Sequence, residues 1–343
     1  MTELTGTYLN DAAVTGKEPR TCLVSVYHGG KNKARRDATV RAIEAWDAQS
    51  VRPDDAVFME LVCPGDDACF GAGDMPSWLR YVRMIGEDRN AGLFQKEAMW
   101  NICAGMTRGD KMLFLDCDSM PVGDKDHFAK LYGAAGKGLC VHVGEKLVHE
   151  GQPAPGDLYY SVFLPKSDVP RGRGQFHGIG YVIHRDDFEA MGGFNPFAIN
   201  GGGDTIFLVE NVNVDLEFPF AKRTLYGIVR KSGLGLMPVV VEGTTMQHNF
   251  HGLKTDRVYR SIRRIVNLFG VPTSYCHIDQ SGLLAWNDPE FLLRYMNMRF
   301  DRLHNDNEIV SLIVETVLDR LQHYNEMDKG DFAYDETDFN SLV

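Results

Sequence analysis

The chain has 343 residues and a formal net charge of -11, with 44% hydrophobic and 24% charged residues. This length can bury a sizeable core, as one large domain with an extension or as two smaller domains, and the composition is typical of soluble globular proteins. The acidic net charge argues against extensive electrostatic binding of nucleic acid. The sequence has no apolar run of about 18 residues that could span a bilayer. The seven cysteines are scattered and include no C-x-x-C pair, so neither a disulfide framework nor a zinc site is indicated. With a polar start that lacks a signal-peptide core, the expected location is cytoplasmic.

The predicted elements of the first half alternate between strands and helices. After a polar lead-in over 1–20, apolar runs predict buried strands at 21–27, 56–62 and 111–115. Helical spacing of apolar residues predicts helices over 35–46 and 94–106, and a Pro/Gly/Asp-rich loop covers 63–76. The alternation predicts an α/β fold with parallel strands and right-handed crossovers.

The second half is richer in glycine and proline and is expected to add shorter strands. These are predicted at 139–143, 158–164, 179–183 and 237–241. Two amphipathic helices follow through 291–300 and 310–321. We therefore expect one main domain over 21–283, with halves 21–145 and 146–283, a helical extension over 284–327 and an acidic tail over 328–343.

Two carboxylates one residue apart end the strand at 111–115. Asp116 and Asp118 then lie at a carboxyl strand end, where open α/β sheets bind ligands. Adjacent carboxylates repel each other unless a cation or water relieves them, so the pair favours a divalent metal site, although two acids also suit a solvated turn. The chain contains neither G-x-G-x-x-G nor G-x-x-x-x-G-K-[ST], the two glycine-rich patterns that bind phosphates. We therefore expect a metal ion to hold the phosphate groups of a ligand.

A run of three glycines precedes an acid at 201–204. Gly202 and Gly203 would let a ligand approach the backbone, and Asp204 would point a carboxylate at that ligand. The alternative is that Asp204 only caps the helix that it opens.

Two histidines and a basic segment follow the strand at 237–241. His248 and His251 could give a neutral imidazole to a metal that carboxylates already hold, or could be structural. A helix with a basic face is then predicted, and it is either a phosphate-binding patch or a solvated surface. Its candidate phosphate-binding residues are Lys254, Arg257 and Arg260.

The chain resembles GT-A-fold glycosyltransferases in the order of its motifs. The strand with Asp-x-Asp comes first, then the glycine-rich acid, and then the histidine beside a basic segment. The likeness is greatest to the β-1,4-galactosyltransferase group and to glycosyltransferase-like proteins of bacteriophages. Residues 94–98 (FQKEA) resemble the segment that precedes the Asp-x-Asp strand in that group, 202–205 (GGDT) resemble its acceptor motif, and 248–251 (HNFH) resemble its metal-binding Met-x-x-His.

The resemblance implies a GT-A-type (Rossmann-like) mixed sheet flanked by helices, with a donor-nucleotide half over 21–145 and an acceptor half over 146–283. It implies Mn²⁺ or Mg²⁺ on Asp116 and Asp118 with His251 or His248, and a nucleotide-sugar donor such as a UDP-sugar. Asp204 would be the base of the transfer, which we expect to be inverting. The expected donor-binding residues are Tyr27, Arg35, Lys96, Asp116, Gly202 and Gly203.

The acceptor and two rival classes stay open. A hydroxymethylated DNA base of a phage, in the host cytoplasm, and an ordinary glycan are both candidate acceptors, and no membrane partner is expected. A haloacid-dehalogenase-type phosphotransferase also places Asp-x-Asp after an apolar strand, with the first acid as nucleophile. The other rival is a non-catalytic sugar- or nucleotide-binding protein.

Overall fold

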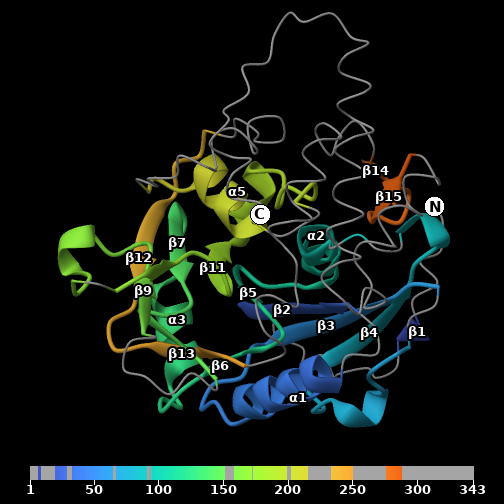
Figure 1. The fold of residues 1–343 in the computed structure, drawn as a ribbon, viewed down its shortest axis with the longest axis horizontal. Coiled ribbons are helices and arrows are strands. Elements are labelled where there is room, and N and C mark those ends of the chain that lie inside the picture. The colour runs from blue at the N-terminus through green and yellow to red at the C-terminus, as the bar shows by residue number, and fades with distance from the viewer. Residues whose placement is uncertain are drawn as a thin grey trace, which may run out of the picture.

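An eight-stranded mixed sheet forms the centre of the computed structural model (Figure 1). The structure describes residues 7–8, 20–28, 33–64, 67–90, 93, 95–150, 158–171, 173–198, 202–214, 233–249 and 276–287. In spatial order the strands are β1 (Thr7–Tyr8), β4 (Arg80–Ile85), β3 (Asp55–Val62), β2 (Thr21–His28), β5 (Lys111–Leu115), β11 (Gly180–His184), β7 (Leu139–His142) and β12 (Met237–Val240).

Strand direction brings several strand ends to one edge of this sheet. β4, β3, β2 and β5 are parallel neighbours, whereas β11 runs antiparallel to both β5 and β7. The central strands are buried on both faces, which explains their nearly continuous apolar sequences. The α/β class and the mixed sheet predicted from the sequence are confirmed, and the three predicted strands that correspond to β2, β3 and β5 are parallel as expected.

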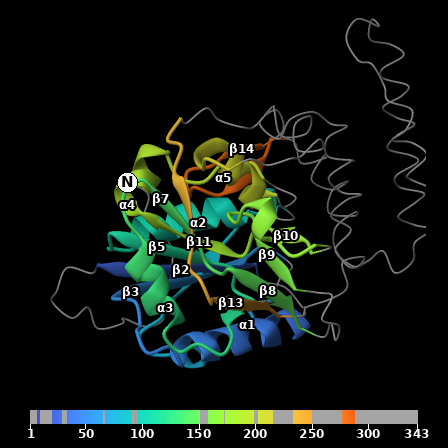
Figure 2. The same ribbon diagram turned by 90° about the vertical axis from the view of Figure 1, so that its left-hand side faces the viewer.

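Helices cover both faces of the sheet (Figures 1 and 2). α1 (Lys33–Asp47) and α3 (His127–Ala134) lie on one face, and α2 (Lys96–Met106), α4 (Arg185–Ala190) and α5 (Gly203–Asn211) lie on the other. Alternate residues of β2 serve the two sides: Leu23 belongs to the core that contains Trp46 of α1, and Val24 to the core that contains Trp100 of α2.

A second sheet extends from the end of β5. Its order is β10 (Gln175–Phe176), β9 (Tyr159–Ser161), β8 (Lys146–His149), β13 (Thr245–His248) and β6 (Ser119–Pro121). A hairpin of β14 (Cys276–Ile278) and β15 (Leu284–Trp286) lies beside the short helical turn η2 (Asp88–Asn90) at the start of α2. Two further turns, η1 (Ala72–Asp74) and η4 (Lys166–Asp168), lie in connections.

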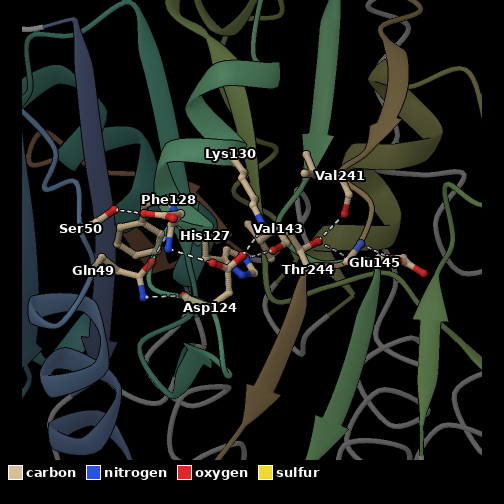
Figure 3. Close-up of polar contacts among 12 residues, drawn as sticks. Gln49, Ser50, Asp124, His127, Phe128, Lys130, Val143, Glu145, Val241 and Thr244 are labelled. Carbon is tan, nitrogen blue, oxygen red and sulfur yellow. Dashed lines mark hydrogen bonds and ion pairs between the residues drawn. The ribbon is translucent and has the colours of Figure 1, made fainter.

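A polar network fixes α3 against the connections around it (Figure 3). The side chain of Gln49 donates to the backbone oxygen of Asp124 and accepts from the Phe128 amide. His127 contacts the backbone oxygen of Val143 through Nε2, at 2.7 Å, and burial lowers its pKa. These bonds hold the segment that follows β6 and so support the turn that carries Asp118.

Two sequence predictions need correction. Strand β4 was not predicted, and it follows the loop that was predicted over 63–76; η1 is the helical turn described in that loop. The strand expected at 158–164 is shorter, because after β9 the Leu164 amide donates to the Ser161 oxygen and closes a turn. The expected helices at 291–300 and 310–321, the basic segment and the tail lie outside the described residues, and the domain limits stay predictions.

Within the described ranges, no helix is long and apolar enough to cross a membrane.

Candidate active site

The two acids of the Asp-x-Asp motif lie in the turn between β5 and β6. The Asp116 amide donates to the backbone oxygen of Ile179 at 2.9 Å, and the Ser119 amide donates to the Asp116 oxygen at 3.1 Å. The turn therefore holds both carboxylates at the carboxyl end of β5. The side chain of Asp116 is 22% exposed and that of Asp118 is 8% exposed.

Lys96 joins the first of these acids to the acid at the start of α5. Its Nζ lies 3.0 Å from Asp116 Oδ1 and 3.3 Å from both carboxylate oxygens of Asp204. The same atom lies 4.5 Å from the centre of the Trp100 ring, a cation–π contact. Three elements, α2, β5 and α5, thus meet at one ammonium group; Figure 1 shows α2 and α5 on the same side of β5.

The attraction between Lys96 and the carboxyl groups around it explains why these charged residues are stable where they are largely buried. Burial by itself lowers the pKa of Lys96, but the carboxyl groups of Asp116, Asp204 and Glu97 outweigh it and raise that pKa well above its usual value. Burial raises the pKa of Asp116 to about 6, although Lys96 opposes the shift, and Asp204 and Asp118 add to it. Lys96 is therefore a permanent cation among competing acids.

Asp204 lies in the first turn of α5 without capping it. The N-cap residue is Gly202, which has a left-handed φ of 86° and no side chain to cap with. The carboxylate of Asp204 instead contacts Lys96, and a Cβ atom at Gly178 would lie 2.6 Å from Asp204 Oδ2. Asp204 is therefore not the N-cap residue of α5.

The turn at 177–180 lies against Asp116 and Asp204, and a hydrogen bond from His142 supports it. Ile179 has a left-handed φ of 76°, which is costly for a β-branched residue and is the strain expected at functional sites. His142 donates from Nε2 to the Gly178 oxygen at 3.1 Å and accepts at Nδ1 from the Ser161 hydroxyl at 2.6 Å. Burial lowers the pKa of His142 to about 4, so this support stays neutral at ordinary pH.

Asp118 is paired with a histidine from the second sheet. His248 Nε2 lies 3.5 Å from Asp118 Oδ1, and the Asn249 amide donates to the Asp118 backbone oxygen at 2.8 Å. The ring of His149 on β8 lies 5.3 Å from that of His248. The structure therefore brings His248 to the Asp-x-Asp motif, whereas His251 lies outside the described residues.

The residues present fit a divalent cation only in part. No group of three or more His, Cys, Asp and Glu side chains among the described residues is arranged to hold a metal ion. Asp118 and His248 nevertheless offer one carboxylate and one imidazole side by side. Imidazole suits Mn²⁺ better than Mg²⁺, which prefers oxygen ligands, and phosphate oxygens of a donor commonly complete such sites.

Two of the expected donor-binding residues lie on the α1 side of this edge. The Arg35 guanidinium lies 5.0 Å from the centre of the Tyr27 ring. Burial raises the pKa of the Cys117 thiol to about 12; Asp118 adds to the shift, and Arg35 opposes it. Tyr27 is only 1% exposed and packs against Phe58 and Phe70, so the ring that contacts Arg35 is held in place.

Sequence reasoning missed two features of the site. Glu97 is buried beside Lys96, but an acid in the first turn of a helix carries no signal that separates it from an exposed one. The turn at 177–180 was read only as the start of a strand, although its H-G-I-G sequence is the signal of a special backbone conformation. The proposed phosphate patch of Lys254, Arg257 and Arg260 lies outside the described residues.

No family model matches the sequence, and no curated protein matches it. Solved structures of glycosyltransferases share features of the fold. A mannosyltransferase from Pyrobaculum calidifontis in complex with GDP-Man and Mn²⁺ is 12% identical, with 95% of this chain and 79% of that chain covered and a TM-score of 0.39. TarS 1-349 from S. aureus in complex with UDP is 11% identical, with 88% and 82% covered and a TM-score of 0.39.

The catalytic domain of β1,4-galactosyltransferase 7 from Drosophila, in complex with xylobiose, is 15% identical, with 56% of this chain covered and a TM-score of 0.34. The chain spans 60% of that domain. Because these TM-scores are all below 0.5, the function proposed below rests on the geometry of the site.

Proposed function

We propose that the protein is a metal-dependent glycosyltransferase of the GT-A type that moves a sugar from a nucleoside-diphosphate donor to an acceptor hydroxyl. The observation that carries the proposal is the Lys96 bridge, which places the Asp-x-Asp motif and the glycine-rich acid Asp204 in one site. A metal-and-phosphate group and a proton acceptor both have to lie near the reacting sugar carbon in such a reaction, because the bond to the leaving phosphate breaks at the carbon where the new bond forms.

Each residue has a chemical task in this proposal. Breaking the sugar–phosphate bond develops negative charge on the diphosphate, and a divalent cation held by Asp118 and His248, with Asp116 beside them, would stabilise that charge. Lys96 and Arg35 add positive charge on the protein side. Gly202 and Gly203 would let the donor approach the start of α5.

Asp204 is the proposed base, and it takes the proton of the acceptor hydroxyl as the new glycosidic bond forms. Its carboxylate is in contact with Lys96 in the free protein. A bound diphosphate gives Lys96 another anion to contact, so donor binding would free Asp204 for its task. We infer an inverting transfer, in which the base lies on the sugar face opposite the leaving group.

The decisive experiment is a screen of UDP- and GDP-sugars with Mn²⁺ that measures release of nucleoside diphosphate. Turnover is expected with one of these donors, and Asp118→Asn is expected to abolish it while the circular dichroism spectrum is unchanged. Asp186→Asn is the matched control, since that acid lies at the surface in a pair with Lys137. Phosphate release from a phosphomonoester, without sugar transfer, would favour the phosphotransferase instead. Tight nucleotide binding without any turnover would favour a binding protein.

The proposed acceptor is a hydroxyl on a modified DNA base, with a glycan as the alternative. The basic residues Arg257 and Arg260 support DNA, whereas the net charge of -11 limits it to few phosphate contacts and a steep loss of affinity with salt. The active enzyme should be offered hydroxymethylated-pyrimidine DNA, unmodified DNA and free saccharides. Transfer to saccharides alone, unaffected by replacing Arg257 and Arg260 with Glu, would exclude the DNA acceptor.

A further inference from the structure

Glu97 follows Lys96 in the first turn of α2, and its carboxyl group is buried within the candidate active site. The residue is 1% exposed, and neither side-chain oxygen accepts a hydrogen bond from another described residue. The Lys96 ammonium lies 3.9 Å from Glu97 Oε1, which is beyond hydrogen-bond distance. A buried carboxyl group without hydrogen bonds destabilises the folded chain, so packing alone gives no reason for a glutamate here.

Gly203, the first residue of α5, makes the space that Glu97 occupies. A Cβ atom at position 203 would overlap Glu97 Oε1 and would also crowd the Cδ and Cγ atoms. Gly203 does not have a positive φ, unlike its neighbour Gly202, so its backbone conformation would suit any residue. The glycine therefore leaves the space that the glutamate fills, and the Glu97 carboxyl group lies against the backbone that carries Asp204.

We propose that Glu97 is a positioning residue, whose buried carboxyl group between the starts of α2 and α5 fixes Lys96 relative to Asp204. This inference rests on the proposed function. α2 supplies Lys96 and α5 supplies Asp204, and Glu97 is the side chain through which the two helix starts are in contact at Gly203. A change of its shape would alter the distance between the ammonium and the proposed base.

The charge state of Glu97 agrees with this role. Burial raises its pKa to about 8; Lys96 opposes the shift, and Asp204 adds to it. At neutral pH the group is therefore an uncharged acid. It fills the space between the helices without becoming a third anion that competes with Asp116 and Asp204 for Lys96.

The test compares Glu97→Gln with Glu97→Leu in the full chain. Glutamine keeps the shape and neutrality, so its kcat should stay within about threefold of the wild-type value. Leucine removes the unbonded polar atoms but changes the shape, so its thermal midpoint should be equal or higher while kcat falls at least tenfold. Met99→Leu, a buried residue of the same helix, is the control and should leave kcat unchanged. Parallel losses of midpoint and kcat in Glu97→Leu, or full activity, would overturn the positioning role.

A double-mutant cycle tests the contact itself. Gly203→Ala should lower the thermal midpoint in the wild-type chain, because the new Cβ displaces the Glu97 carboxyl group. In a Glu97→Ala background the same change should lower the midpoint much less, since the space is then open. Losses of midpoint that simply add would show that the two residues act independently and would overturn the proposal.

Failure of the proposed function would look different. A wild-type protein that releases no nucleoside diphosphate from any donor would overturn both the function and the role given to Glu97 in it. The thermal midpoints of the cycle would still show whether Glu97 and Gly203 pack together. Conversely, an active wild-type enzyme whose double-mutant cycle shows additive losses of midpoint would overturn the positioning role alone.

Discussion

Lys96 Nζ lies 3.3 Å from each of the two carboxylate oxygens of Asp204, so it contacts both equally. The same ammonium group contacts Asp116 at 3.0 Å, so one cation neutralises two acids from distant parts of the chain. Without it, the two carboxylates would repel each other in a site that excludes most water. This relationship makes Lys96 a structural residue as well as a proposed donor contact.

Lys96→Met should therefore affect both stability and activity. Removing one partner of a largely buried ion pair leaves the other charges uncompensated, and we expect the free energy of unfolding to fall by about 3 kcal/mol. Nucleoside-diphosphate release should fall roughly 100-fold, because the cation near the leaving group is lost. Urea unfolding and donor turnover measure the two effects. Unchanged stability would show that the bridge contributes nothing to the fold.

His248→Ala should weaken binding of Mn²⁺ together with nucleoside diphosphate. The imidazole lies 3.5 Å from Asp118 Oδ1, so its loss removes the nitrogen donor beside the carboxylate. We expect affinity to fall about 10- to 100-fold, as for removal of a ligand or its partner. Isothermal titration calorimetry of both His248→Ala and His251→Ala identifies which histidine binds the metal. Full turnover in excess chelator would argue against any metal.

Asp204→Asn should remove chemistry more than donor binding. The amide keeps the size of the side chain but accepts no proton, and loss of a general base commonly costs about 100- to 10,000-fold in kcat. The donor KM should change only a few-fold. Steady-state kinetics with the working donor and acceptor separate the two parameters. Lost donor affinity at unchanged kcat would make Asp204 a binding residue.

Stability should fall as pH rises from about 4.5 to about 8, through Glu97. Because burial raises the pKa of Glu97 from 4.5 to about 8, the folded chain keeps a proton that the unfolded chain has lost over this range. The unfolded state therefore binds fewer protons, and the free energy of unfolding decreases with pH. Urea titrations of wild type and Glu97→Gln should differ in this slope, by on the order of 3 kcal/mol across the range. Parallel profiles would show that Glu97 is ionised in the fold.

The sequence alone determined the α/β class, most strands of the main sheet and the strand-end position of Asp116 and Asp118. These features depend on local patterns: strands buried on both faces need nearly continuous apolar runs, as in 21–27, and an acid that directly follows such a run lies at the strand end. The glycine-rich start of α5 at Gly202 was visible for the same reason, since a turn needs residues that tolerate a left-handed backbone. Strand β4 was missed because its sequence mixes charged and apolar residues.

Only the tertiary structure decided which of these residues meet. The contact of Lys96 with Asp204 joins positions 108 residues apart, and that of Glu97 with the Gly203 backbone depends on how α2 and α5 pack on one face of the sheet. Local sequence patterns do not encode such distances, because packing between elements sets them. The burial that raises the pKa of Glu97 has the same origin: surrounding elements remove water from a side chain whose sequence neighbours resemble those of an exposed acid.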